Sequence, residues 1–282
     1  MTPHQDDAQM RGDRQMRGDR PGRLDVRRPY LFTFLIVIMI MVVTGASGAG
    51  AAVSGLPTSD FELGAEVVLA VLAAVGLTRL HSWRDVGFRP LARARDLRLY
   101  WVPLFPVLPV LAPAVSGLTG IGLGQLGVYL ALAGLIGFVE EVFFRGLILR
   151  SLAARGALRA AIVSSVLFGL MHSVNVLFGA DPAATLLQAG YATAMGFSFA
   201  TVTLRTGVIW PLIIIHGSIN AAGFVTAGGT ISTGVTSADV MVSAIYIVGF
   251  TIYGVIVLQT AQRPIARPTA DEGTLSRSSD PR

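Results

Sequence analysis

Long apolar runs divide the 282-residue chain, and they constrain its fold more than any other feature. Each run is about 20 residues long, which is enough for one α-helix to cross a hydrocarbon core of roughly 30 Å. Helices are the expected form, because unpaired backbone groups are costly in lipid and no alternating strand pattern occurs. The sequence therefore predicts an all-α polytopic membrane helix bundle with about eight transmembrane helices. The expected spans are approximately 31–53, 62–78, 99–118, 124–146, 160–179, 183–204, 207–227 and 238–260.

The basic residues are all arginine, and those between the runs lie in alternate connections. Seven arginines precede the first run, six lie in the second connection, three in the fourth, one in the sixth and four after the last run. The first, third, fifth and seventh connections have none. Because positively charged loops stay in the cytoplasm, both termini are predicted to be cytoplasmic in a multi-pass protein of the cell membrane. Since topology accounts for the net charge of +5, we expect the lipid bilayer as a partner and no nucleic acid.

Two polar tails flank the predicted membrane domain, which covers residues 30–260. Residues 1–29 contain a tandem QMRGDR repeat and residues 261–282 are similarly polar, so both are predicted to be disordered cytoplasmic tails. The third apolar run contains several prolines, so we expect that span to be kinked or partly unwound. These prolines are Pro103, Pro106, Pro109 and Pro113.

Polar side chains lie deep inside three of the predicted spans, where such groups are rare and expensive. Glu140 and Glu141 lie in the fourth span, His172 lies in the fifth, and His216 and Asn220 lie in the seventh. A helical rise of about 1.5 Å per residue, counted from the nearest loop arginines, places Glu140, His172 and His216 at depths of about 15, 20 and 16 Å. Three helices are therefore expected to present polar groups at one level in the membrane.

Helical spacing also predicts which of these groups are neighbours. Residues three or four apart share a helix face, whereas adjacent residues diverge by about 100°. Glu140 should therefore point away from Arg145, the predicted partner of Glu141. The predicted neighbours are Glu141 with Arg145, His216 with Asn220, and Phe168 with His172.

Three short motifs on these spans resemble those of one membrane protease family. EEVFFR at 140–145, FGLMH at 168–172 and HGSIN at 216–220 are similar to the EExxxR, FxxxH and HxxxN motifs of the CPBP family. That family comprises the CAAX proteases and bacteriocin-processing enzymes and is also called the Abi family. The match covers the order, spacing and helix placement of all three motifs, within a family-like region of roughly 60–260.

The resemblance implies an intramembrane glutamic endopeptidase that uses neither a metal nor another cofactor. In the implied scheme, a glutamate acts as general base on a water that a histidine also holds, and a second histidine with an asparagine stabilises the oxyanion. The expected substrate is a peptide or a membrane-anchored protein segment that enters a cavity open to the cytoplasm. The implied catalytic residues are Glu140 as base, His172 at the water, and His216 with Asn220 at the oxyanion; Glu141, Arg145 and Phe168 support them.

Other interpretations remain open from the sequence. Glu140, His172 and His216 could form a two-histidine, one-carboxylate zinc site, although the HExxH signature is absent. The GASG sequence around Ser47 fits the GxSG of rhomboid-type serine proteases, but its predicted position lies toward the outer face. A transporter or proton relay would also use intramembrane Glu, His and Arg, and a binding or bacteriocin-immunity protein could use the scaffold without cleavage.

Overall fold

The computed structural model describes residues 27–56, 58–107, 118–227 and 234–262. Within these ranges the chain is a bundle of helices without β-strands, which confirms the predicted fold class. The α-helices are α2 Pro29–Ser54, α3 Thr58–Arg79, α4 Trp83–Val86, α5 Trp101–Leu104, α7 Leu123–Glu140, α8 Leu149–Ala153, α9 Ala157–Met171, α10 Pro182–Thr206, α11 Trp210–Ala227 and α12 Ser237–Gln262. The 3-10 helices are η1 Ala94–Tyr100, η2 Leu118–Gly120 and η4 His172–Phe178, and η3 Glu141–Ile148 is a π-helix.

Five segments of the described chain are long and apolar enough to cross a membrane. They are Pro29–Ser54, Asp60–Arg79, Leu123–Ala153, Ala157–Val176 and Ser237–Thr260, and Trp210–Thr226 is a shorter apolar helix. These six match six of the predicted spans. The predicted span 183–204 corresponds to α10, which has 25 residues but is less apolar because many of its side chains are small or hydroxylated. α10 packs against α9 and α12, and small residues favour such close packing.

The predicted third span, 99–118, is only partly described. Its described part contains the end of η1 and the short helix α5, whereas residues 108–117, with Pro109 and Pro113, lie outside the described residues. The described part is interrupted after Leu104, which agrees with the expectation of a broken span. The predicted tails lie almost entirely outside the described residues.

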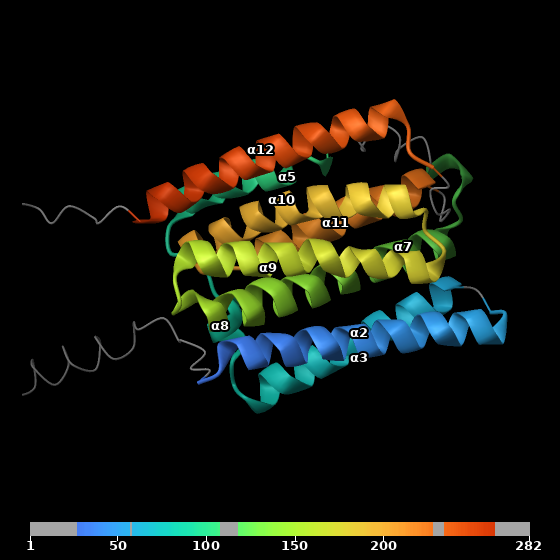
Figure 1. The fold of residues 1–282 in the computed structure, drawn as a ribbon, viewed down its shortest axis with the longest axis horizontal. Helices are drawn as coiled ribbons and strands as arrows, with labels where there is room; N and C mark the ends of the chain where they lie inside the picture. The colour runs from blue at the N-terminus through green and yellow to red at the C-terminus, as the bar shows by residue number, and fades with distance from the viewer. Residues whose placement is uncertain (1–26, 57, 108–117, 228–233, 263–282) are drawn as a thin grey trace, which may run out of the picture.

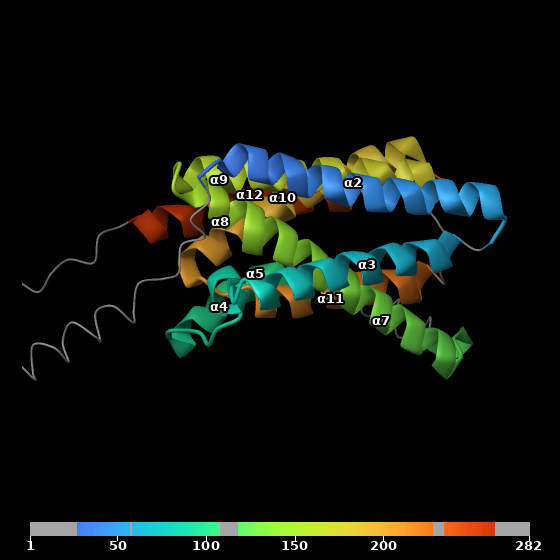
Figure 2. The same cartoon turned by 90° about the horizontal axis from the view of Figure 1, so that it is seen from below.

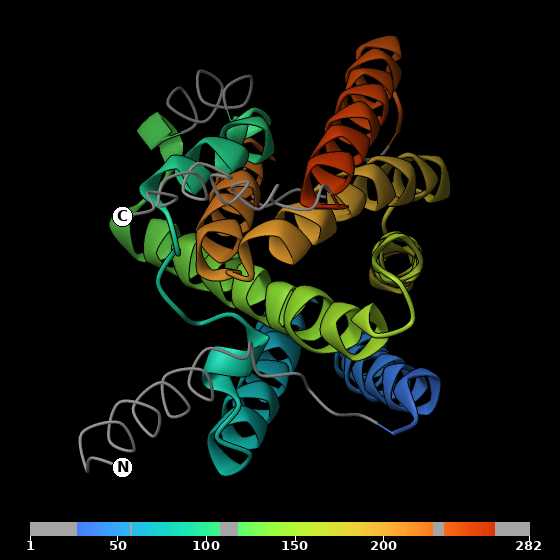
Figure 3. The same ribbon diagram turned by 90° about the vertical axis from the view of Figure 1, so that its left-hand side faces the viewer.

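The long helices form two layers joined by one oblique segment. In Figure 2, α2, α9, α10 and α12 lie in one layer, and α3, α5 and α11 lie in the other. The continuous segment of α7, η3 and α8 crosses from the second layer to the first. Seen from one end, this segment runs between α2 and α3 on one side and α10 and α11 on the other (Figure 3). It therefore occupies the centre of the bundle.

The arginine-bearing connections gather at one end of the bundle. α2 begins and α12 ends at this same end, on the left in Figure 1. Here Arg89 Nε and Arg150 Nη2 both donate to the carbonyl oxygen of Gly207, at 2.9 and 2.8 Å. Gly207 ends α10 in the left-handed conformation, with φ of 70°, which glycine adopts without steric cost. Three connections of the chain are thus tied together at the end that the arginine pattern assigns to the cytoplasm.

Candidate active site

The two adjacent glutamates lie where α7 changes into a π-helix. Glu140 is the last residue of α7, and Glu141 is the first of η3. π-Helical turns are rare and occur frequently at functional sites, because they disturb the regular hydrogen-bond ladder. The hydroxyl of Ser164 on α9 donates to the carbonyl oxygen of Phe144 inside the π-helix, at 2.8 Å. Helix α9 thereby supplies a hydrogen bond to this irregular backbone.

Behind the site, Glu141 and Arg145 form the predicted ion pair, and both are fully buried. Arg145 Nη1 donates to Glu141 Oε1 at 3.0 Å. The guanidinium carbon lies 4.1 Å from the ring centroid of Phe168 and 5.4 Å from that of Phe199. A planar guanidinium favours such contacts with aromatic faces. A Cβ at Gly196 would lie 3.2 Å from Arg145 Nη2, so the glycine keeps room for this arginine.

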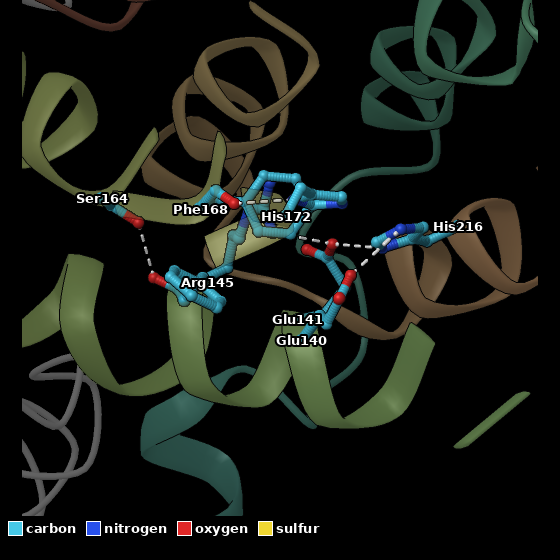
Figure 4. Close-up of polar contacts among 8 residues, drawn as sticks. Glu140, Glu141, Arg145, Ser164, Phe168, His172 and His216 are labelled. Atoms are coloured by element: carbon cyan, nitrogen blue, oxygen red, sulfur yellow. Dashed lines mark hydrogen bonds and ion pairs between the residues drawn. The ribbon is translucent and has the colours of Figure 1, made fainter. Parts of the chain in front are cut away.

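His216 contacts both glutamates (Figure 4). Its Nδ1 is hydrogen-bonded to Glu141 Oε1 at 3.0 Å, and its Nε2 lies 3.3 Å from Glu140 Oε2 without hydrogen-bond geometry. A carboxylate only accepts, so the Nδ1 atom carries the proton in its bond with ionised Glu141. Arg145 is bonded to Glu141, as the spacing predicted, but one imidazole reaches both carboxylates, which the spacing did not predict.

A close approach of two helices brings His216 to the glutamates. A Cβ at Gly137 on α7 would lie 2.8 Å from the carbonyl oxygen of Ile213 and 2.9 Å from the amide nitrogen of Gly217 on α11. Real Cβ contacts are essentially never this short, so only glycine permits this spacing. Gly137 lies one turn before Glu140 and Gly217 directly follows His216, so the close contact brings these two side chains together.

His172 begins η4 at the end of α9, and its ring orientation is fixed from two sides. Nδ1 lies 2.8 Å from the carbonyl oxygen of Phe168, and the two rings pack edge to face with centroids 4.9 Å apart. A carbonyl oxygen cannot donate, so Nδ1 is the protonated nitrogen and donates to it. In the neutral imidazole the other nitrogen, Nε2, is then an acceptor. The predicted packing of Phe168 beneath His172 is present.

These side chains meet at a cavity of about 730 Å³. Glu140, His172, His216 and Asn220 all line the cavity, whereas Glu141, Arg145 and Phe168 are buried behind its wall. The Glu140 side chain is 24% exposed, so it is accessible to water. Asn220 Nδ2 is buried and has no hydrogen-bond partner in the described part of the chain. The structure thus separates the four residues predicted to be catalytic from the three predicted to support them.

The cavity also contains polar residues that the sequence analysis did not select. Glu62 and Glu66 on α3 line it, as do Asn175 and Gln188, which are hydrogen-bonded at 2.9 Å. The Glu66 carboxyl lies close enough to that of Glu140 to interact electrostatically. The rule that selected Glu140 applied to Glu66 as well, since both are carboxylates inside a span, but Glu66 lies near the start of its apolar run.

The serine and zinc interpretations of the site can be compared with the structure. Ser47 donates to the carbonyl oxygen of Phe61 and does not line the cavity, which argues against a serine nucleophile at this site. Among the described residues there is no group of three or more His, Cys, Asp or Glu side chains placed to hold a metal ion. The fold and the site together define an all-helical, polytopic membrane protein with paired glutamates and histidines at an intramembrane cavity.

Comparison with known proteins finds a family match over part of the chain. The model of the family described as "Type II CAAX prenyl endopeptidase Rce1-like" matches residues 122–222. This segment contains α7, η3, α8, α9, η4, α10 and most of α11, and therefore all three motifs. The match over residues 122–222 agrees with the resemblance of the three motifs to the CAAX protease (CPBP) family. No curated protein and no solved structure gives a significant match to the chain.

Proposed function

We propose that the chain is an intramembrane endopeptidase that hydrolyses peptide bonds with a glutamate-activated water. The family match supports a CAAX-type protease. The observation that carries the mechanism is that a water-accessible carboxylate, Glu140, and the acceptor nitrogen of His172 line the same cavity within the bundle. The substrate is a peptide or a membrane-anchored protein segment, since the cavity lies among membrane-spanning helices.

In the proposed reaction, Glu140 and His172 hold one water molecule by accepting hydrogen bonds from it. Glu140 takes a proton as the water oxygen attacks the carbonyl carbon of the scissile bond. The C–N bond then breaks, and Glu140 returns the proton to the leaving nitrogen. The products are a carboxylic acid and an amine, between which the remaining water proton is transferred to give a carboxylate and an ammonium, and Glu140 is ionised again for the next cycle.

The oxyanion of the tetrahedral intermediate needs a donor that is not already in use. Asn220 Nδ2 meets this requirement, because it is buried, lacks a partner and belongs to a cavity-lining residue. Nδ1 of His216 is bonded to Glu141, and Nε2 lies 3.3 Å from Glu140 Oε2, so we assign His216 mainly to positioning the two carboxylates. It donates to Glu140 as well only in its imidazolium form, in which both nitrogens carry a proton. Arg145 balances the charge of Glu141 behind them, and Phe168 fixes His172.

The test is cleavage of a peptide library by the purified full-length chain in liposomes, with free and membrane-anchored peptides. Glu140→Gln should lower the rate by about 10²–10⁴-fold, the usual contribution of a general base. Asn220→Ala should lower it by about 10²–10³-fold. Asn175→Ala is the matched control, because this asparagine lines the same cavity but has no role in the scheme, and its rate should change by a few fold at most.

The same assay distinguishes the alternatives. Full activity of Glu140→Gln would refute the proposed base. Loss of wild-type activity in a strong chelator, restored by added zinc, would favour a zinc site at Glu140, His172 and His216 instead. A folded wild-type chain that cleaves neither free nor anchored peptides would favour a transport, binding or immunity role.

A further inference from the structure

The cavity occupies one half of the bundle along its long axis. On α10, which ends at Thr206 at the arginine-bearing end, the last lining residue is Tyr191. On α3, which ends at Arg79, the last is Leu69, and on α11 the first is His216. The lining therefore extends from the level of Glu140 toward the end without arginines, which lies on the right in Figure 1.

The opposite half of the bundle is filled. Large side chains of η3, α8, α11 and the residue before α11 are fully buried between the site and the arginine-bearing loops. Beyond them, two arginines are fixed on the carbonyl oxygen of Gly207. The expected opening toward the cytoplasm is therefore wrong if the arginine-bearing end is cytoplasmic. The buried side chains on this path are Ile148, Leu149, Leu152, Ile209 and Leu212.

At the other end, exposed residues lead into the cavity. Val235, Ala238 and Asp239, at the start of α12, line the cavity and are exposed. Ala184, near the start of α10, lines it as well. These residues lie at two connections, the fifth and the seventh, and neither carries an arginine. By the positive-inside rule such connections face away from the cytoplasm.

We infer that the cavity takes its substrate from the non-cytoplasmic side of the membrane. The substrate class is then a secreted peptide or the outer-face segment of a membrane-anchored protein. That the molecule entering the cavity is a substrate rests on the proposed proteolysis. The direction of the opening itself rests only on the lining residues and on the arginine pattern.

The chain contains no cysteine, so single cysteines can report on access without background. Ala238→Cys places a thiol at the cavity mouth, and Ala154→Cys is the matched alanine replacement at an exposed turn after α8, among the arginine-bearing loops. Ile136→Cys tests the depth of the cavity, because Ile136 lines it one turn before Glu140. Each chain is expressed in intact cells and treated with a membrane-impermeant maleimide, or with a small charged thiosulfonate for Ile136→Cys.

We expect Ala238→Cys and Ile136→Cys to react from outside intact cells, and Ala154→Cys to react only after permeabilisation. A bulky maleimide on Ala238→Cys should lower peptide cleavage at least tenfold, whereas on Ala154→Cys it should leave cleavage unchanged. Reaction of Ala154→Cys from outside, or failure of Ala238→Cys to react there, would overturn the inference. Correct labelling without any cleavage by the unlabelled chain would count against the proposed function and leave the access route standing.

Discussion

Gly137→Ala tests whether the contact between α7 and α11 sets the site geometry. The added Cβ would meet the backbone of α11 at 2.8 and 2.9 Å, where ordinary contact begins at 3.4 Å. Backbone atoms cannot rotate aside, so the two helices must separate by about 0.5 Å. Overpacking of this kind costs about 1–3 kcal/mol. The same shift lengthens the 3.0 Å hydrogen bond between His216 and Glu141 to about 3.5 Å, beyond the usual range.

Two measurements follow from this displacement. The thermal unfolding midpoint of the purified chain should fall by several degrees. Peptide cleavage should fall by about 10–100-fold, because the base is no longer held in position. Gly134→Ala is the control, since it lies on the same helix one turn earlier and its Cβ would meet nothing within 4 Å. Equal stability and activity of the two variants would refute the claim that close helix approach positions the site.

Three further outcomes are expected. Arg145→Lys should lower the free energy of unfolding by about 3 kcal/mol in a denaturation assay, because an ammonium cannot both fill the space between two rings and neutralise the buried carboxylate. The exposed control Arg155→Lys should change the free energy of unfolding by less than about 0.5 kcal/mol. The cavity lining contains carboxylates and no arginine or lysine among the described residues, so a peptide with lysine beside the cleaved bond should be cleaved about tenfold faster than its glutamate counterpart at low salt. Glu66→Gln should reduce this preference while cleavage of a neutral peptide continues, and equal rates for both charged peptides in the wild type would contradict the electrostatic reasoning.

Much of the fold follows from the sequence, because lipid allows few alternatives for a chain with these apolar runs. Two segments show what apolarity alone does not predict. α10 is largely buried, and this helix, which is rich in threonine, alanine and glycine, packs against α9 and α12. An apolarity criterion alone therefore undervalues this helix. The described part of the third span consists of η1 and α5, and its prolines predicted that it would not be one regular helix.

The level of the site was predictable, but its open side was not. Counting residues from the arginines gives a depth for each polar side chain, and the four residues predicted to be catalytic do line one cavity. Depth alone does not indicate whether the space lies above or below that level. This depends on how bulky side chains such as Ile148 and Leu212 fill the arginine-bearing half, which is a property of packing between helices that are distant in sequence.

The contact of one histidine with two consecutive glutamates was missed for a physical reason. In a regular α-helix, adjacent side chains diverge by about 100°, so the argument from spacing separated Glu140 from Glu141. The chain instead changes from α- to π-helix between these residues, and an imidazole presents its two nitrogens in different directions. His216 can therefore contact both glutamates. Glu141 is buried against Arg145, whereas Glu140 is open to the cavity. One carboxylate is then buried against a guanidinium while its neighbour is accessible to water, which is the arrangement that the proposed general base requires.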